Sequence, residues 1–198
     1  MKLSDKKRLN ILDAAEQLFF ECGVEHATMD QIAKAAQASK RTVYNHFSTK
    51  DELFQAILTR MFEQLDDTQE IQFNVSLPIK SQLRKIAQQE VELLTSERFL
   101  RIAKITFMQM LQQPSLAKSI ANNEFGCMRY LGAFLQYANE AKKLQIDDID
   151  FAAKQFVFAL KGFIFYPILY GFETHSSLNI TDIIEKNITA FLAQYQAS

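Results

Sequence analysis

A short stretch near the N-terminus, SKRTVYNHF over residues 39–47, gathers side chains that are suited to contact nucleic acid. Lys40 and Arg41 are long enough to reach guanine O6 and N7, or phosphates. Thr42 offers a hydroxyl or a methyl group to thymine, and Asn45 can pair with an adenine edge. The spacing of these four residues along one short segment therefore predicts base contacts in a DNA groove.

A second group of polar side chains suits the DNA backbone. Tyr44, His46 and Lys50 are better placed for phosphates, which fix the register of a protein on DNA without carrying sequence information. Thr28 is expected at a helix N-terminus, where free N–H groups and a hydroxyl favour a phosphate. The same residue types also occur on the solvated surface of ordinary helical bundles, so the surrounding elements must decide between the two interpretations.

Those elements are short helices with clear start signals. Thr28 followed by Gln31 is a capping-box pattern, and it predicts a helix over Met29–Ala35. Ser39 is a good N-cap for a third helix that ends at His46. A tight turn separates the two helices, and the ordered series of caps, turn and amphipathic neighbours predicts a helix-turn-helix.

One helix precedes this pair and a longer one follows it. Apolar residues recur at helical spacing from about Ser4, and Gly23 stands where a left-handed C-terminal cap is needed. Thr49 and Glu52 form another capping-box pattern. They predict a fourth helix over residues 50–70, which we expect to be the lever that joins the two domains.

The composition of the 198 residues predicts an all-α fold. Only 5 residues are Gly and 3 are Pro, so few positions break a helix. Helical patterns continue over residues 79–95, 97–112, 115–143, 148–171 and 181–196. We therefore expect a three-helix DNA-binding head over residues 1–48 and a helical bundle over residues 49–198.

Charge and sequence signals exclude several functional classes. A formal net charge of −1 argues against a protein that coats nucleic acid non-specifically. We find neither a secretory pattern nor a segment long enough to cross a membrane, so we expect a cytoplasmic protein with no membrane partner. The three histidines are scattered, and the chain has no phosphate loop or nucleophile elbow. We expect no enzymatic activity, no metal and no cofactor.

The two cysteines, Cys22 and Cys127, are too few and too far apart for a disulfide framework or a metal cluster. Cys127 suits a packed apolar position, with a redox-sensing thiol as the alternative.

The C-terminal part is rich in Phe, Tyr and Met, which can line an apolar cavity or fill a core. Met110, Phe134 and Tyr137 are our candidates for contact with an apolar or aromatic ligand. From Phe151 to Tyr170, 15 of 20 residues are apolar, which predicts a helix that is buried on two sides.

That apolar helix and the last helix predict a face for a second copy of the chain. The same pattern would also arise if both helices simply closed the core of one subunit. The candidate dimer-interface residues are Phe156, Phe163, Ile184, Ile188 and Phe191.

The N-terminal quarter resembles the TetR/AcrR family of bacterial transcriptional regulators. The resemblance runs from Arg8 to about Leu53 and is carried by Ile11, Ala14, Ala15, Leu18, Phe19, Gly23, Thr28, Ile32, Ala33, Ala36, Ser39, Thr42, Tyr44, His46, Phe47, Lys50 and Leu53. It implies a homodimer that binds a palindromic operator in double-stranded DNA. It also implies a C-terminal ligand-binding and dimerisation domain, in which a small-molecule effector shifts the heads and releases the DNA.

By position, the resemblance makes Lys40, Arg41, Thr42 and Asn45 base-contact candidates, and Thr28, Tyr44, His46 and Lys50 phosphate-contact candidates. Two departures from the family pattern concern the head. Gln37 stands in the turn where the family commonly has Gly, and Arg41 stands in the recognition helix where it often has Gly.

A repressor is the function we expect, and two alternatives stay open. One is an activator of the same fold. The other is a helical carrier or protein-interaction module that no longer binds DNA.

Overall fold

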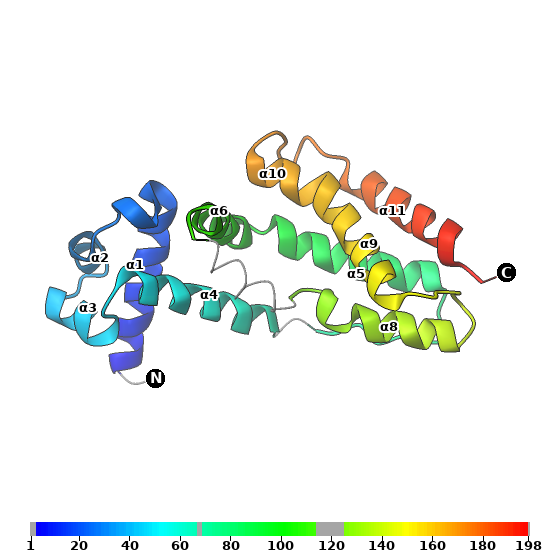
Figure 1. Ribbon diagram of the computed structural model, residues 1–198, viewed down its shortest axis with the longest axis horizontal. Coiled ribbons are helices and arrows are strands. Elements are labelled where there is room, and N and C mark those ends of the chain that lie inside the picture. The colour runs from blue at the N-terminus through cyan, green and yellow to red at the C-terminus, as the bar shows by residue number, and fades with distance from the viewer. Residues whose placement is uncertain (1–2, 67–68, 114–124, 198) are drawn as a thin grey trace. The chain divides into compact units, whose positions relative to one another are not determined.

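The computed structural model describes residues 3–66, 69–113 and 125–197, and in these residues it contains helices and one isolated bridge but no β-strand. The all-α prediction is confirmed. The chain divides into two compact units, Met1–Leu65 with Arg101–Asn122, and Asp66–Leu100 with Asn123–Ser198 (Figure 1). This division does not follow the predicted boundary after residue 48, because the fourth helix packs with the head.

The first unit holds α1 (Leu3–His26), α2 (Met29–Ala35), α3 (Lys40–His46), α4 (Lys50–Asp66) and the larger part of α6 (Glu97–Gln112). Apolar side chains from all of these helices fill one core, among them Ile11, Phe19, Ile32, Val43, Leu53, Ile57 and Ile105. The fourth helix joins this core because Leu53, Phe54, Ile57 and Leu58 recur at helical spacing and are all buried. It ends at Asp66, short of the predicted residue 70.

The end of α1 differs from the predicted left-handed cap. Gly23 has a φ of 83°, a value that glycine adopts without a steric cost. Its ψ of 158° nevertheless places it outside the left-handed helical region. The chain therefore kinks at Gly23 and makes one more short helical turn, which ends at His26.

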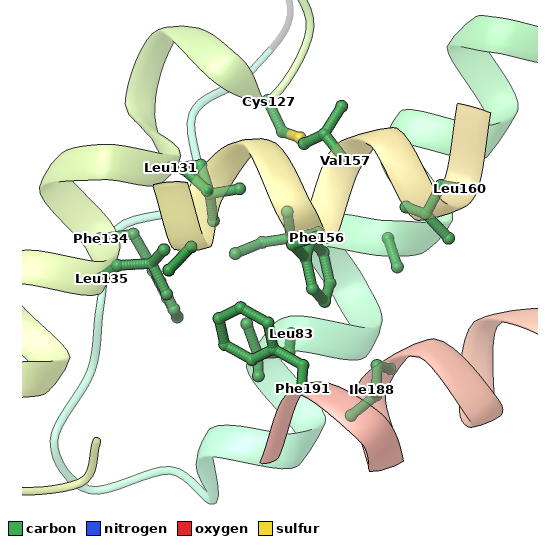
Figure 2. Close-up of a cluster of buried hydrophobic side chains, with 14 of the residues drawn as sticks. Leu83, Cys127, Leu131, Phe134, Leu135, Phe156, Val157, Leu160, Ile188 and Phe191 are labelled. Atoms are coloured by element: carbon green, nitrogen blue, oxygen red, sulfur yellow. The ribbon is translucent and has the colours of Figure 1, made fainter. Parts of the chain in front are cut away.

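The second unit contains α5 (Ile79–Thr95), α8 (Met128–Glu140), α9 (Ile149–Leu160), a π-helical turn η1 (Lys161–Phe165), α10 (Tyr166–Tyr170) and α11 (Ile180–Tyr195). Its core is formed where α5, α8, α9 and α11 meet. Figure 2 shows Leu83, Leu131, Phe156, Ile188 and Phe191 converging from these four helices. Phe156 and Phe191 meet edge to face, with 5.2 Å between their ring centroids.

One predicted helix was too long. The pattern over residues 115–143 predicted a continuous helix, but α8 begins at Met128. Gly126 has a φ of 62°, which a right-handed helix cannot accommodate, so the helix starts after it. The part of the pattern over residues 115–124 lies outside the described residues.

The prediction that no segment is long enough to cross a membrane was wrong. By length and composition alone, the 22-residue run Ile149–Tyr170 could do so, although core helices pass the same test. Ala152, Phe156 and Leu160 from this run are fully buried in the core of the second unit. Core packing thus explains the apolar residues on one side of the run.

Candidate nucleic-acid interface

The turn between α2 and α3 is built by backbone hydrogen bonds around a left-handed residue. Gln37 has a φ of 52°, in the left-handed region, at the position where the family commonly has Gly. The N–H of Gln37 donates to the carbonyl of Lys34 (3.2 Å), and the N–H of Ala38 donates to that of Ala33 (2.9 Å). This pair of bonds is a Schellman motif, which closes α2 and directs the chain into α3.

Both helices of the motif begin as predicted. Thr28 and Gln31 form a complete capping box, in which the Thr28 hydroxyl accepts from the N–H of Gln31 at 3.2 Å. The Gln31 side chain in turn accepts from the N–H of Thr28 at 2.8 Å. At the start of α3, the Ser39 hydroxyl accepts from the N–H of Thr42 at 3.0 Å.

The seven residues of α3 divide sharply between a buried and an exposed side. Val43 is fully buried, and the following Phe47 is 1% exposed, so these two residues fix the helix on the core of the head. The exposed side carries four of the predicted DNA contacts, namely Lys40, Arg41, Tyr44 and Asn45. The structure therefore brings three of the predicted base contacts, Lys40, Arg41 and Asn45, together with the phosphate candidate Tyr44 on one accessible surface.

Two of the remaining candidates on α3 are partly engaged inside the head. The Thr42 hydroxyl lies 2.8 Å from the Ser39 hydroxyl, so it is already engaged in a local hydrogen bond. The His46 ring packs beside that of Phe47, with 6.4 Å between centroids. Both side chains are half-buried and are therefore held in place before any DNA arrives.

An ion pair holds the first residue of the recognition helix. The Lys40 ammonium lies 2.6 Å from the Asp30 carboxylate of α2. The hydrogen bond to Asp30 is the main cause that raises the pKa of Lys40, followed by the charge of that carboxylate. Both side chains are more than half exposed, so the pair is weak and Lys40 can exchange Asp30 for a DNA phosphate or base at small cost.

Lys50 has a structural role that the sequence did not predict. Its ammonium donates to the carbonyls of Val24 (2.8 Å) and Glu25 (2.7 Å), which end the last turn of α1. A cation is favourable at this position because carbonyl dipoles converge at a helix C-terminus. In the structure Lys50 thus ties α4 to α1, and a phosphate would have to compete with two carbonyls for it.

Further contacts that stiffen the head were also not predicted from the sequence. Arg60 on α4 pairs with Asp13 and Glu16 on α1, at 2.6 Å in each case. The Arg8 guanidinium lies over the Phe47 ring, 4.8 Å from its centroid. The ion pairs between α1 and α4 could not be predicted from the sequence, because they depend on how the two helices pack.

The three candidate ligand residues do not form one site. Phe134 and Tyr137, both on α8, line the same groove in the second unit, together with the segment 69–77. Met110 belongs to the first unit, where it packs against the apolar core of the head. The aromatic composition that suggested all three could not distinguish between the two units.

Cys127 is a packed residue, 2% exposed, at the start of α8. Burial is the main cause that raises the pKa of its thiol well above the ordinary value, followed by the charge of Glu90. The neighbouring carboxylate of Glu90, also buried, accepts from the N–H of Cys127 at 2.8 Å. A thiol held neutral in this way is a poor nucleophile, which disfavours the redox-sensing alternative.

The predicted dimer-interface residues require a correction. Phe156, Ile184, Ile188 and Phe191 are at most 5% exposed, because they fill the core of their own subunit, although Phe191 also lines a surface groove. Phe163, by contrast, is 65% exposed. It lines a shallow groove of about 470 Å³ between α9, η1 and α11, and small or apolar side chains line the groove beside it, namely Ala159, Ile183 and Ala190.

Two family patterns match the chain. That of the bacterial regulatory proteins of the tetR family matches residues 11–57, which include the whole helix-turn-helix. That of the C-terminal domain of AefR-like transcriptional repressors matches residues 81–197.

Individual proteins give the same result. The HTH-type transcriptional regulator YhgD of Bacillus subtilis is 35% identical over 81 residues, which is 41% of this chain and 42% of the relative's own length. A TetR family transcriptional regulator from Pseudomonas syringae pv. tomato is 29% identical, with a TM-score of 0.80 over 98% of this chain and 99% of that one. The flavonoid-responsive regulator FrrA is also 29% identical, with a TM-score of 0.74 over 97% and 98% of the two chains. Proteins of this family are transcriptional regulators and not enzymes, and this chain belongs to the TetR family.

Proposed function

We propose that this regulator is a homodimeric repressor that binds a palindromic operator and is released by a small apolar or aromatic effector. The observation that carries the proposal is the exposed side of α3, where Lys40, Arg41, Tyr44 and Asn45 stand on a helix that is already capped and packed. Repression is favoured by the likeness of residues 81–197 to the C-terminal domain of AefR-like repressors. The likeness to a flavonoid-responsive regulator favours an aromatic effector. The protein would act in the cytoplasm.

The proposed DNA contacts follow from the position of each side chain. Lys40, Arg41, Thr42 and Asn45 would contact bases, with Thr42 acting mainly through its methyl group. Thr28, Tyr44 and His46 would contact phosphates and so fix the register. For Lys50 we now propose that its main role is to hold α4 on α1, and that any phosphate contact is secondary.

The proposed dimer uses the outer side of α9, η1 and α11. Phe163 is 65% exposed there, and Ala159 and Ala190 provide small residues that allow a close approach. Large apolar side chains gathered on one face are unfavourable in water unless a partner covers them. A second copy of the chain would cover them symmetrically and would present two heads to the two half-sites of a palindrome.

A gel-shift titration on DNA from upstream of the protein's own gene tests DNA recognition. An unrelated fragment of equal length and two salt concentrations provide the comparison. Selective binding that survives the higher salt supports an operator-specific regulator. Equal, weak binding to both fragments that collapses with salt would indicate phosphate attraction only.

Two substitutions on α3 sharpen this test. Arg41→Ala is expected to weaken operator binding by about 1–3 kcal/mol and to relax specificity at one position of each half-site. Tyr44→Ala should weaken binding to all DNA sequences alike, because phosphates carry no sequence information. Lys143→Ala, an exposed cation in the second unit, is the control and should leave affinity unchanged. If both α3 variants bind like the wild type, the carrier or interaction-module alternative gains support.

The sign of regulation needs a separate measurement. A reporter fused to the operator-containing promoter should rise when the gene for this protein is deleted. A fall in the reporter would instead identify an activator, the other alternative within the same fold.

A further inference from the structure

A groove of about 630 Å³ lies in the second unit between α8 and the segment 69–77. Its size is within the range of cavities that hold drug-sized molecules. Six side chains give the groove its chemical character, four of them aromatic and two acidic: Phe73, Tyr130, Phe134, Tyr137, Glu70 and Glu140.

The floor of the groove is a rigid aromatic surface. Phe134 is 2% exposed and Tyr130 is 6% exposed, so both are anchored in the core. Phe73 meets Phe134 edge to face with 5.6 Å between the ring centroids, which holds the segment 69–77 against α8. Tyr137 is 59% exposed and forms an accessible aromatic wall. A flat apolar molecule could therefore bury its surface without rearranging the core.

The charged side chains that line the groove are both acidic. Glu70 and Glu140 are both exposed, and none of the described residues that line the groove is a lysine, arginine or histidine. Burial is the main cause that raises the pKa of the Tyr130 phenol. The charges of Glu90 and, last, Glu70 add to this shift, and the charge of Arg129 opposes it.

We propose that this groove binds an aromatic or lipophilic organic cation, and that such a cation is the effector. The aromatic faces would attract the cation through their quadrupoles, and the two carboxylates would attract it through their charges. An anion of the same shape would meet two like charges and would be rejected. The link from binding to DNA release rests on the proposed function, whereas the binding site itself does not.

Two other grooves of the second unit lack this combination. The groove on the opposite side of segment 69–77 is lined mainly by polar side chains and includes Lys85. The groove beside Phe163 carries Lys186 as well as Asp182 and lies on the proposed dimer face. Of these three grooves, the one at Tyr137 is therefore the best suited to an aromatic cation.

A pair of dyes that share a ring system but differ in charge tests the proposal. Rhodamine 6G is a cation and fluorescein is an anion, and both contain a xanthene ring. Fluorescence anisotropy of each dye is measured against increasing concentrations of the full chain without DNA. Saturable binding of rhodamine 6G with at least tenfold weaker binding of fluorescein is expected. Equal binding of the two dyes, or no binding of rhodamine 6G, would overturn the proposal.

Variants locate the binding in this groove. Glu70→Gln with Glu140→Gln should weaken rhodamine 6G binding about tenfold, because each exposed charge contributes a factor of a few. Tyr137→Ala should weaken it about threefold through the lost aromatic face. Glu92→Gln removes an exposed charge from α5 outside the groove and is the matched control. If the double variant and Glu92→Gln bind the dye equally well, the assignment to this groove is wrong.

A third measurement separates this proposal from the proposed function. Rhodamine 6G is added to the protein bound to its operator in the gel-shift assay. Release of DNA by the wild type, with a weaker response of the double variant, supports the groove as the effector site. Charge-selective dye binding without release refutes its effector role but preserves the binding site. Failure to bind any operator refutes the proposed function, while the dye titration still decides the site.

Discussion

At the scale of single residues, the head contains a strained position that its backbone hydrogen bonds hold in place. Gln37 adopts a left-handed conformation at the end of α2, where a side chain costs about 1 kcal/mol relative to glycine. The sequence left this conformation open, because only the family's common Gly at this position pointed to it. Lys142, with a φ of 55°, ends α8 in the same way, and nothing in the sequence pointed to it.

Gly126 and Gly132 offer a matched pair of substitutions. A Cβ atom added to Gly126 would lie 2.3 Å from Oε2 of the buried Glu90, and the φ of this residue is +62°. Gly126→Ala is therefore expected to lower the free energy of unfolding by about 2 kcal/mol or more. Gly132 lies inside α8 with no atom within 4 Å of an added Cβ. Gly132→Ala should raise the free energy of unfolding by up to about 1 kcal/mol, through helix propensity alone.

Thermal unfolding of the two variants beside the wild type measures both effects. Equal melting temperatures for the two alanine variants would show that the contact between Gly126 and Glu90 has no energetic consequence.

At the scale of elements, helices with polar caps were predicted accurately from the sequence. The starts of α2 and α3 were correct because Thr28 and Ser39 use local hydrogen bonds that depend on neighbouring residues only. The assignment of apolar faces was less reliable. Helical periodicity identified Phe156 and Ile188 as apolar positions, but it cannot say whether they face their own core or a partner. That choice depends on long-range packing.

The ion pairs of Arg60 join α4 to α1 and allow a prediction about the stability of the head. Arg60 and Glu16 have only 12% and 7% of their side chains exposed, whereas the Asp13 side chain is 68% exposed. Arg60→Ala should lower the free energy of unfolding by about 3 kcal/mol, because it removes the ion-pair partner of the buried Glu16 carboxylate. Asp13→Ala should cost less than about 1 kcal/mol, because water already solvates that carboxylate.

Urea denaturation of the full chain, followed by circular dichroism, would measure both values. The interpretation fails if the two substitutions have the same cost, since burial would then play no part.

At the scale of the whole molecule, the proposed dimer depends on the exposed side chain of Phe163. Phe163→Glu should place a charge in the apolar face, and chains at micromolar concentration should then become monomeric. Operator binding should fall by at least tenfold, because a monomer contacts only one half-site. Leu111→Glu, a substitution at an 87% exposed residue of the first unit, is the control for added charge.

Sedimentation velocity would give the mass of each species, and a gel shift would give its affinity. If the Phe163→Glu variant is still dimeric, the dimer interface lies on another surface of the chain.

The π-helical turn Lys161–Phe165 has a consequence for insertions and deletions in this gene. A π turn holds one residue more than an α-helical turn, so everything after it is rotated by about 100° relative to a continuous α-helix. Loss of the single codon for Gly162, a residue with open space around it, could therefore be absorbed by conversion of the turn to α-helix. The reading frame would stay intact, while the helix would present a different side chain to whatever covers it. The loss of one codon at this point is enough to change the exposed face around Phe163 without altering the core.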